Sequence, residues 1–288
     1  MTGTLDAALS AAQPSPRSSA AADQEAALRN RLPHWPSVVW VEQAGSTNAD
    51  LLAALREGHP TPALLGAHWQ SGGRGRAGRP FLTPSGTALT FSCAFRTPLP
   101  PAAMPTLSIW LGLAAWTALA ELLPAGHALR LKWPNDLQWG EAKLAGILME
   151  SAGHRPGQPG GLVIGIGINL APGDALSATL QRPVAGWADT GHGATPDDLA
   201  QAIANQWQTA LEIAQRAWQP ALGLPFLPAA FAEADVLASR AIRLLDQGRE
   251  QATGTACGVD TFGRLGLAKN DAPIQWLSVG DVSVRPTP

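Results

Sequence analysis

The chain has 288 residues, of which 45% are hydrophobic, so it is long enough for one main core and a small second domain. Its formal net charge of −2 argues against general binding to nucleic acid. No apolar run is long enough to cross a membrane, and no secretory signal is evident. The two cysteines form no disulfide framework or zinc-site spacing. We therefore expect a cytoplasmic protein that does not enter a membrane.

The first 35 residues are rich in Ala, Ser, Pro and Gln and contain few large apolar side chains. A segment of this composition cannot bury enough surface to offset the entropy lost on ordering, so we predict that residues 1–35 are disordered. A winged helix–turn–helix would be expected at this position in a DNA-binding protein, but the amphipathic helices that it requires are absent. We therefore expect no binding to DNA.

From residue 36 the pattern alternates between strands and helices. Strands are predicted at 38–42, 63–69, 88–95, 128–133, 143–150 and 161–170, and helices at 47–55, 105–123 and 195–218. Thr47 and Thr195 are the predicted N-caps of the first and last of these helices. Short strands at 241–245, 253–258, 264–268 and 279–284 then predict a small β-barrel. We expect an α/β protein of the α+β type, with domains at 36–236 and 237–288.

A loop that alternates glycine with arginine follows the second predicted strand. Its glycines let the backbone approach a ligand closely, and Arg74, Arg76 and Arg79 supply positive charge for a phosphate or carboxylate. A Gly-x-Gly-x-x-Gly match begins at Gly73, but Pro80 prevents the long helix that a dinucleotide fingerprint needs, and no acidic residue follows at the usual distance. We interpret the segment as an anion-binding loop, with a solvated surface loop as the alternative.

Two of the three lysines of the chain lie within 12 residues of each other. Lys132 opens the sequence Lys-Trp-Pro-Asn-Asp, in which Asn135 and Asp136 offer hard oxygen ligands suited to Mg²⁺ beside phosphates. By itself such a turn is most often only a turn. Lys143 begins a buried strand whose small residues leave space for a ligand, although a lysine at a strand end can also simply extend into solvent.

The strand that ends in Gly-Ile-Gly-Ile-Asn places isoleucine side chains on one face and bare backbone on the other. Gly165 and Gly167 lie on the bare face, and Asn169 follows them. A flat organic ring can lie against such a surface.

Taken together and in this order, these motifs resemble those of the biotin–protein ligases over nearly all of 36–288. The early Ser-Thr-Asn at 46–48 also matches, and the stretch 258–267 looks like the C-terminal SH3-like barrel of that family. The resemblance implies a mixed-sheet catalytic domain like that of class II synthetases, followed by this barrel. One departure is Phe81, which stands where the family usually has a tryptophan that stacks on adenine.

What the resemblance implies is a two-step, ATP-dependent reaction. The carboxylate of biotin attacks the α-phosphate of ATP, with Mg²⁺, to give biotinyl-5′-adenylate, and a lysine of a biotin carboxyl carrier protein then takes the biotin. The carrier would belong to acetyl-CoA carboxylase or a related biotin-dependent carboxylase. The enzyme would be a monofunctional ligase without a DNA-binding domain, either a monomer or a weak homodimer.

The resemblance also implies roles for individual residues. Lys143 and Arg76 would be catalytic: Lys143 would bridge the biotin carboxylate and the α-phosphate, and Arg76 would hold the adenylate phosphate. The implied biotin site comprises Ser46, Thr47, Asn48, Gln70, Gly73, Arg74, Gly75, Arg76, Lys143, Gly146, Gly165 and Gly167. The implied ATP site comprises Arg74, Arg76, Arg79, Phe81, Lys132, Asn135, Asp136, Lys143 and Asn169. Asn135 and Asp136 would contact Mg²⁺ through the phosphates.

Two other functions fit the sequence less well. A lipoate–protein ligase also activates a carboxylate with ATP, but its loop has the form Arg-Arg-x-x-Gly-Gly-Gly, whereas this loop alternates glycine with arginine. A nucleic-acid-binding module would use the Arg-Gly loop and the barrel, but the net charge is negative and no basic face studded with aromatic residues is evident.

Overall fold

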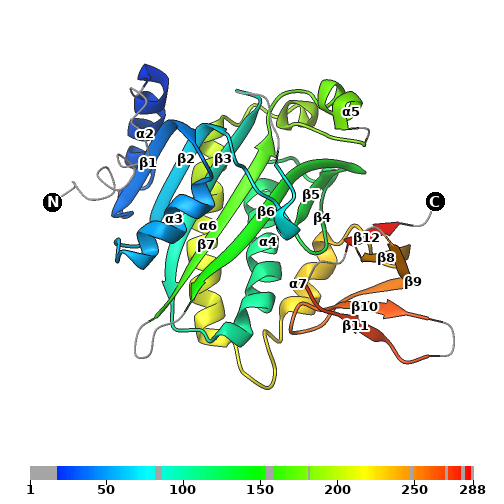
Figure 1. Cartoon of the computed structure of the whole chain (residues 1–288). Helices are drawn as coiled ribbons and strands as arrows, with labels where there is room; N and C mark the ends of the chain where they lie inside the picture. The colour runs from blue at the N-terminus through cyan, green and yellow to red at the C-terminus, as the bar shows by residue number, and fades with distance from the viewer. Residues whose placement is uncertain are drawn as a thin grey trace.

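A seven-stranded mixed sheet forms the larger part of the molecule (Figure 1). The computed structural model describes residues 18–81, 86–153, 159–180, 182–246, 249–269, 272–279 and 283–286. In sheet order the strands are β1 (Ser37–Ala44), β2 (Ala63–Gln70), β3 (Ala88–Thr97), β7 (Gly160–Asn169), β6 (Ala142–Gly153), β5 (Asp136–Trp139) and β4 (Leu129–Lys132). Strands β1 and β2 are parallel, and every other neighbouring pair is antiparallel.

Helices cover both faces of this sheet. On one face α4 (Met104–Ala120) and α6 (Pro196–Ala217) pack together and bury the main hydrophobic core. On the other face α3 (Thr47–Arg56) buries a smaller core against β2, β3, β6 and β7. Among the described residues one helix, Pro101–Ala120, is long and apolar enough to cross a membrane, and most of it is buried in this fold. It contains α4 and the preceding 3-10 turn Pro101–Ala103.

The starts of two helices show how local sequence determines their position. Thr195 caps α6 as predicted: its hydroxyl accepts from the Asp198 N–H, and the Asp198 carboxylate accepts from the Thr195 N–H in return. The predicted N-cap of α3 is wrong by one residue. Ser46, not Thr47, accepts from the Ala49 N–H, which leaves the Thr47 hydroxyl available for contacts elsewhere.

The prediction of disorder is also wrong for residues 18–35, because α2 (Ser19–Arg31) packs beside β1. Leu28 is fully buried in the main core. The Glu25 carboxylate accepts from the Trp40 N–H of the edge strand β1 at 3.0 Å. Such a contact satisfies an N–H that an unpaired sheet edge would leave open. Residues 1–17 lie outside the described residues.

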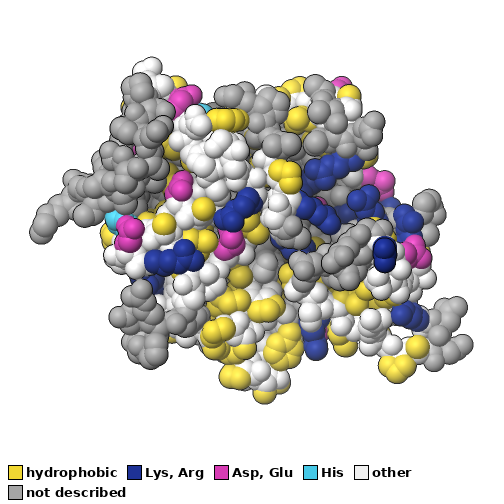
Figure 2. Space-filling model, viewed as in Figure 1, with side chains coloured by type: hydrophobic (Ala, Val, Ile, Leu, Met, Phe, Trp, Pro, Cys, Tyr) yellow, Lys and Arg dark blue, Asp and Glu magenta, His cyan; other side chains and the backbone are white. Residues whose placement is uncertain are grey.

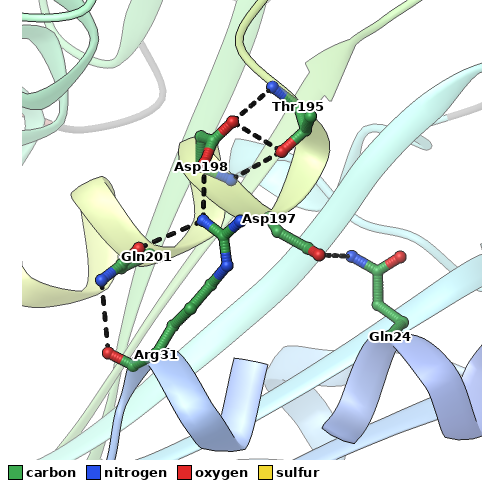
Figure 3. Close-up of polar contacts among 6 residues, drawn as sticks. All are labelled: Gln24, Arg31, Thr195, Asp197, Asp198 and Gln201. Atoms are coloured by element: carbon green, nitrogen blue, oxygen red, sulfur yellow. Dashed lines mark hydrogen bonds and ion pairs between the residues drawn. The ribbon is translucent and has the colours of Figure 1, made fainter. Parts of the chain in front are cut away.

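Polar contacts hold α2 to the start of α6 (Figure 3). The Arg31 guanidinium lies 2.5 Å from the Asp198 carboxylate, and the Gln24 amide donates to Asp197. The Gln201 amide donates to the backbone carbonyl of Arg31 at 3.3 Å. These partners lie more than 160 residues away in the sequence, and few residues of α2 are apolar and buried. The composition of the segment therefore carried no signal of its ordered state.

A separate antiparallel sheet of five strands forms the C-terminal part. Its order is β11 (Gln275–Leu277), β10 (Leu265–Ala268), β9 (Arg249–Val259), β8 (Ala241–Asp246) and β12 (Ser283–Pro286). Three of its strands match the predicted positions; β11 was missed, and the last strand begins four residues later than expected. The sequence also gave no indication of β5, α5 (Asp174–Leu180), the 3-10 turn Trp187–Thr190 or α7 (Leu227–Ala234).

The turn between β9 and β10 docks against the larger part of the molecule. The Trp133 indole N–H donates to the Gly263 carbonyl at 3.0 Å, and the Thr106 hydroxyl donates to the Phe262 carbonyl at 3.1 Å. The Leu224 N–H donates to the Thr261 carbonyl at 2.8 Å. Buried side chains of both sheets belong to one continuous hydrophobic core. A domain boundary near residue 237 stays a prediction.

Candidate active site

A cavity of about 840 Å³ lies between the α3 face of the large sheet, the Gly-Arg loop and the C-terminal sheet. Nine basic side chains and two carboxylates line it, so positive charge is concentrated there although the chain as a whole is slightly acidic. Figure 2 shows Lys and Arg side chains gathered over this part of the molecule, beside the C-terminal sheet. The volume is within the range of sites for small molecules.

Most of the predicted site residues line this cavity. They are Ser46, Thr47, Asn48, Gln70, Arg74, Gly75, Arg76, Arg79, Phe81, Lys132, Asn135, Asp136, Lys143, Gly146, Gly165 and Gly167. Two are placed elsewhere. The Asn169 amide donates to the carbonyls of Lys143 and Ala185 and so ties the segment after α5 to β6. Gly73 packs against the loop itself, where a Cβ would lie 2.8 Å from the Phe81 carbonyl oxygen.

An ion pair lies in the cavity wall where β5 and β6 meet. The Lys143 ammonium is 2.5 Å from the Asp136 carboxylate. Gly146 pairs with Asp136 across the two strands, and a Cβ at Gly146 would lie 3.1 Å from the ammonium nitrogen. The glycine therefore makes room for the lysine side chain. The Asp136 carboxylate holds Lys143 in place. An incoming anion would have to share the Lys143 ammonium with Asp136 or displace Asp136 from it.

Lys132 ends β4 close to this pair. Burial lowers the pKa of its ammonium; Asp136 opposes that effect, and the nearby cations Arg285, Lys143 and Arg182 add to it. A bound polyanion would stabilise the charged form of Lys132. This end of the cavity is therefore suited to phosphate groups.

The Gly-Arg loop is closed by its own backbone and touches the sheet through two arginines. The Gly75 N–H donates to the Arg79 carbonyl at 2.7 Å, with the 3-10 turn Arg76–Gly78 between them. The Arg76 guanidinium donates to the Asn135 side-chain oxygen at 3.3 Å, and the Arg74 guanidinium lies 3.6 Å from the Glu150 carboxylate. The loop thus reaches from Asn135, at the phosphate end of the cavity, to Glu150, which contacts Asn48 at the other end.

The bare glycine face of β7 is covered by side chains of this protein. A Cβ at Gly167 would lie 2.2 Å from the ring of Phe81, so the aromatic ring rests directly on this glycine. A Cβ at Gly165 would lie 2.2 Å from the side-chain oxygen of Asn48. The flat ring expected on this surface is thus, at Gly167, that of Phe81.

Hydrogen bonds connect the polar side chains at the other end of the cavity. The Thr47 N–H donates to the Gln70 side-chain oxygen at 2.9 Å, and the Thr47 hydroxyl lies 2.7 Å from that of Ser92. Ser92 donates to Asn48 at 2.6 Å, and the Asn48 amide donates to the Glu150 carboxylate at 2.9 Å and to the Leu148 carbonyl at 3.1 Å. The oxygen and both N–H groups of the Asn48 amide are therefore directed into the protein.

Sequence reasoning missed several residues of this site. Arg182 follows α5, and Arg240, Arg243 and Arg285 come from the C-terminal part, yet all four line the cavity. Isolated arginines carry no local signal, because only the folded arrangement of these separate segments brings them together. Ser92 was missed for a similar reason, since a small residue in a buried strand is ordinary core sequence.

The described residues could hold Mg²⁺ only if substrate phosphates supplied most of its ligands. They contain no group of three or more His, Cys, Asp or Glu side chains that could hold a metal. Asp136 offers one carboxylate, whereas the Asn135 oxygen already accepts from Arg76 and its amide nitrogen donates to the Ile147 carbonyl. Mg²⁺ commonly binds through one or two carboxylates together with substrate phosphates, and the cavity meets that requirement.

Comparison with known protein families gives two matches. Residues 43–169 match the Biotin/lipoate A/B protein ligase family, and residues 240–285 match the Biotin protein ligase C terminal domain. The two matches correspond to the large sheet with its cavity and to the five-stranded sheet.

Named relatives give longer alignments. The biotin–[acetyl-CoA-carboxylase] ligase of Mycobacterium tuberculosis is 33% identical over 265 residues, which is 90% of this chain and 94% of that protein. The bifunctional ligase/repressor BirA of Escherichia coli is 31% identical over 252 residues, 86% of this chain and 74% of that protein. The structure of biotin protein ligase from Aquifex aeolicus in complex with biotin and ATP superposes with a TM-score of 0.69 over 87% of this chain and 99% of that one. At 22% identity, this last likeness concerns the fold.

Proposed function

The chain belongs to the biotin–protein ligase family, and on that premise we propose that its cavity joins biotin to ATP and then passes the biotin to a lysine of a carrier protein. The observation that carries the proposal is the arrangement of one cavity with a hydrogen-bonding end, a central lysine and an arginine-rich end. The three parts would bind, in this order, the ureido ring of biotin, its carboxylate and the triphosphate of ATP. The carboxylate and the triphosphate are the groups that react with each other.

The hydrogen-bonding end fits the ureido ring of biotin. Thr47 and Gln70 lie together there, and Ser46 lines the same part of the cavity. The polar edge of the ring would lose binding energy if it were buried without partners, so a site with both donors and acceptors is required. Asn48 would support this end from behind, because its amide is already paired within the protein.

Lys143 would act where the two substrates meet. Two anions, the carboxylate and the α-phosphate, must approach each other in the first step, and negative charge builds up between them. Lys143 would leave Asp136 and bind both groups, while Arg76 would hold the phosphate of the adenylate. The second step needs a carrier amine to attack the mixed anhydride with release of AMP. The loop would keep water away from the anhydride until then.

The arginine-rich end fits the triphosphate. Lys132 and Arg79 would contact the phosphates, with Arg182, Arg240 and Arg243 as further candidates. Asp136 would hold Mg²⁺ on the phosphates, where the ion would neutralise charge on the leaving pyrophosphate. Phe81 would stack on an adenine ring after moving away from Gly167.

Enzymes of this family act on biotin-carrying subunits of carboxylases. We propose that the partner of this enzyme is the biotin carboxyl carrier protein of acetyl-CoA carboxylase, as the names of its relatives suggest, and that the reaction takes place in the cytoplasm.

Intact-mass analysis of an apo biotin carrier domain tests the proposal directly. The carrier would be incubated with the enzyme, biotin and MgATP, and in parallel a lipoyl domain with lipoate. We expect a biotin-sized mass gain that requires ATP and is lost in Lys143→Ala. A gain on the lipoyl domain instead would transfer the enzyme to lipoate chemistry, and no gain on either would overturn the ligase proposal.

A further inference from the structure

Ser92 is a buried residue of β3 that lies beside the hydrogen-bonding end of the cavity. Its side chain is 1% exposed, and its strand position pairs with Gly165 of β7. Its hydroxyl contacts two residues, Asn48 and Thr47, at 2.6 and 2.7 Å. Because a hydroxyl carries a single proton, the direction of these two hydrogen bonds can be worked out from their neighbours.

The orientation of the Asn48 amide is fixed first. Its nitrogen lies 3.1 Å from the Leu148 carbonyl and 2.9 Å from the Glu150 carboxylate, and both of these groups only accept hydrogen bonds. The NH₂ group must therefore point to them, and the amide oxygen must face Ser92. Since that oxygen can only accept, Ser92 donates its one proton to Asn48.

The direction of the hydrogen bond between Ser92 and Thr47 follows from this assignment. Ser92 has no proton left, so in the 2.7 Å contact between the two hydroxyls Thr47 is the donor. The Thr47 hydroxyl also lies 3.2 Å from the Gln70 side-chain oxygen, a longer contact that can only share the same proton. The Thr47 oxygen is left with lone pairs only, and Thr47 is one of the residues that line the cavity. The Gln70 side-chain oxygen already accepts from the Thr47 N–H at 2.9 Å. The NH₂ group of the Gln70 side chain can therefore donate to a ligand. The end of the cavity thus presents an obligatory acceptor next to a donor.

We propose that Ser92 is a positioning residue that forces the Thr47 hydroxyl to accept a ring N–H of the ureido group, and so selects ligands that donate at this point. The inference rests on the proposed function, because it concerns how that site recognises its substrate. Gly165 supports it independently. A Cβ there would lie 2.2 Å from the Asn48 oxygen and 2.7 Å from the Ser92 hydroxyl, so the glycine provides the space in which this pair of side chains fits.

Calorimetric binding of biotin and two analogues would test the inference. In each analogue one of the two ring N–H groups is replaced by an oxygen atom, which places lone pairs where the proton was. A site built to accept a hydrogen bond rejects a ligand that cannot donate one, so the wild type should bind one of the two analogues at least about 100-fold more weakly than biotin. In Ser92→Ala the Thr47 proton keeps only the longer 3.2 Å contact with the Gln70 oxygen, so it is held less firmly and can turn toward the ligand. Discrimination against that analogue should then fall by about tenfold or more, with a smaller loss of affinity for biotin itself.

Thr90→Val is the matched control. Thr90 is two residues away on the same strand, is 3% exposed, and donates its hydroxyl proton to the Ala67 carbonyl at 2.7 Å. It removes a buried hydroxyl of β3 outside the Ser92 network, so its discrimination should equal that of the wild type. Thermal melts would accompany each variant. Ser92→Cys, whose sulfur is only a weak acceptor for the Thr47 proton, would replace Ser92→Ala if the alanine variant does not fold, and discrimination should fall in it by a smaller factor.

Three results would decide the matter. A selective loss of discrimination against one analogue supports the inference. An equal loss of affinity for biotin and both analogues in the Ser92 variant, or no loss at all, would overturn it, because either outcome means that Ser92 only fills space. A wild type that binds no biotin would instead overturn the proposed function itself.

Discussion

Truncation of Leu28 tests whether α2 is part of the folded core. Its side chain is 0% exposed and belongs to the main cluster. Leu→Ala at buried sites costs about 2–5 kcal/mol, because transfer energy is lost and a cavity remains. Taking about 3 kcal/mol, and about 2–4 °C per kcal/mol for a chain of this size, we expect Leu28→Ala to melt about 6–12 °C below the wild type.

The assay is thermal unfolding followed by circular dichroism, with urea unfolding followed by tryptophan fluorescence as a second probe. Leu222→Ala is the control, because Leu222 is 52% exposed, and its stability should change by no more than about 0.5 kcal/mol. If Leu28→Ala and Leu222→Ala melted together with the wild type, α2 would not be docked on the sheet, and residues 18–35 would be a passive tail after all.

Further predictions concern activity and pH. Lys143→Ala should slow biotin-dependent ATP–pyrophosphate exchange by about 10²–10³-fold or more, whereas Lys269→Ala, on the C-terminal sheet, should not; equal rates would refute the assigned role. Arg76→Gly should release adenylate that labels bystander proteins, and a variant that makes no adenylate would contradict this. The pKa of Asp198 is lowered to about 2, mainly by the Thr195 hydroxyl, so its contribution to stability is present above about pH 4 and is lost as pH falls toward 2. The urea midpoint of Thr195→Val should therefore fall less steeply over this range, and an identical slope would contradict the assignment.

The parts of the site that the sequence predicted are those made by residues near one another in the chain. Lys143 and Asp136, seven residues apart, were both predicted as site residues from their local motifs, although β5 and therefore the ion pair between them were not predicted. The cap of α6 is equally local, since Thr195 and Asp198 are three residues apart. A cap of this kind can be inferred because the spacing alone determines the contact.

What could not be predicted depends on partners that are distant in the sequence. Ser92 meets Asn48 across 44 positions, and nothing near either residue indicates the other. The ring of Phe81 rests on Gly167, which the motif suggested was a surface for a ligand. Helix α2 is held to α6 by Arg31 and Asp198, so its order comes from tertiary contacts and not from its own composition. In each of these cases the partner residue lies far away in the sequence, so the residues next to it in the chain could not indicate the contact.

The docked turn between β9 and β10 has a practical consequence for anyone who modifies this protein. Tips of β-hairpins are ordinarily the safest places for an inserted tag or a fused domain, because they project into solvent. Here the carbonyls of Phe262 and Gly263 are hydrogen-bonded to Thr106 and Trp133, and a Cβ at Gly263 would already lie 2.8 Å from Ile109. An insertion at this tip would push the two sheets apart, so fusion partners belong elsewhere on the chain.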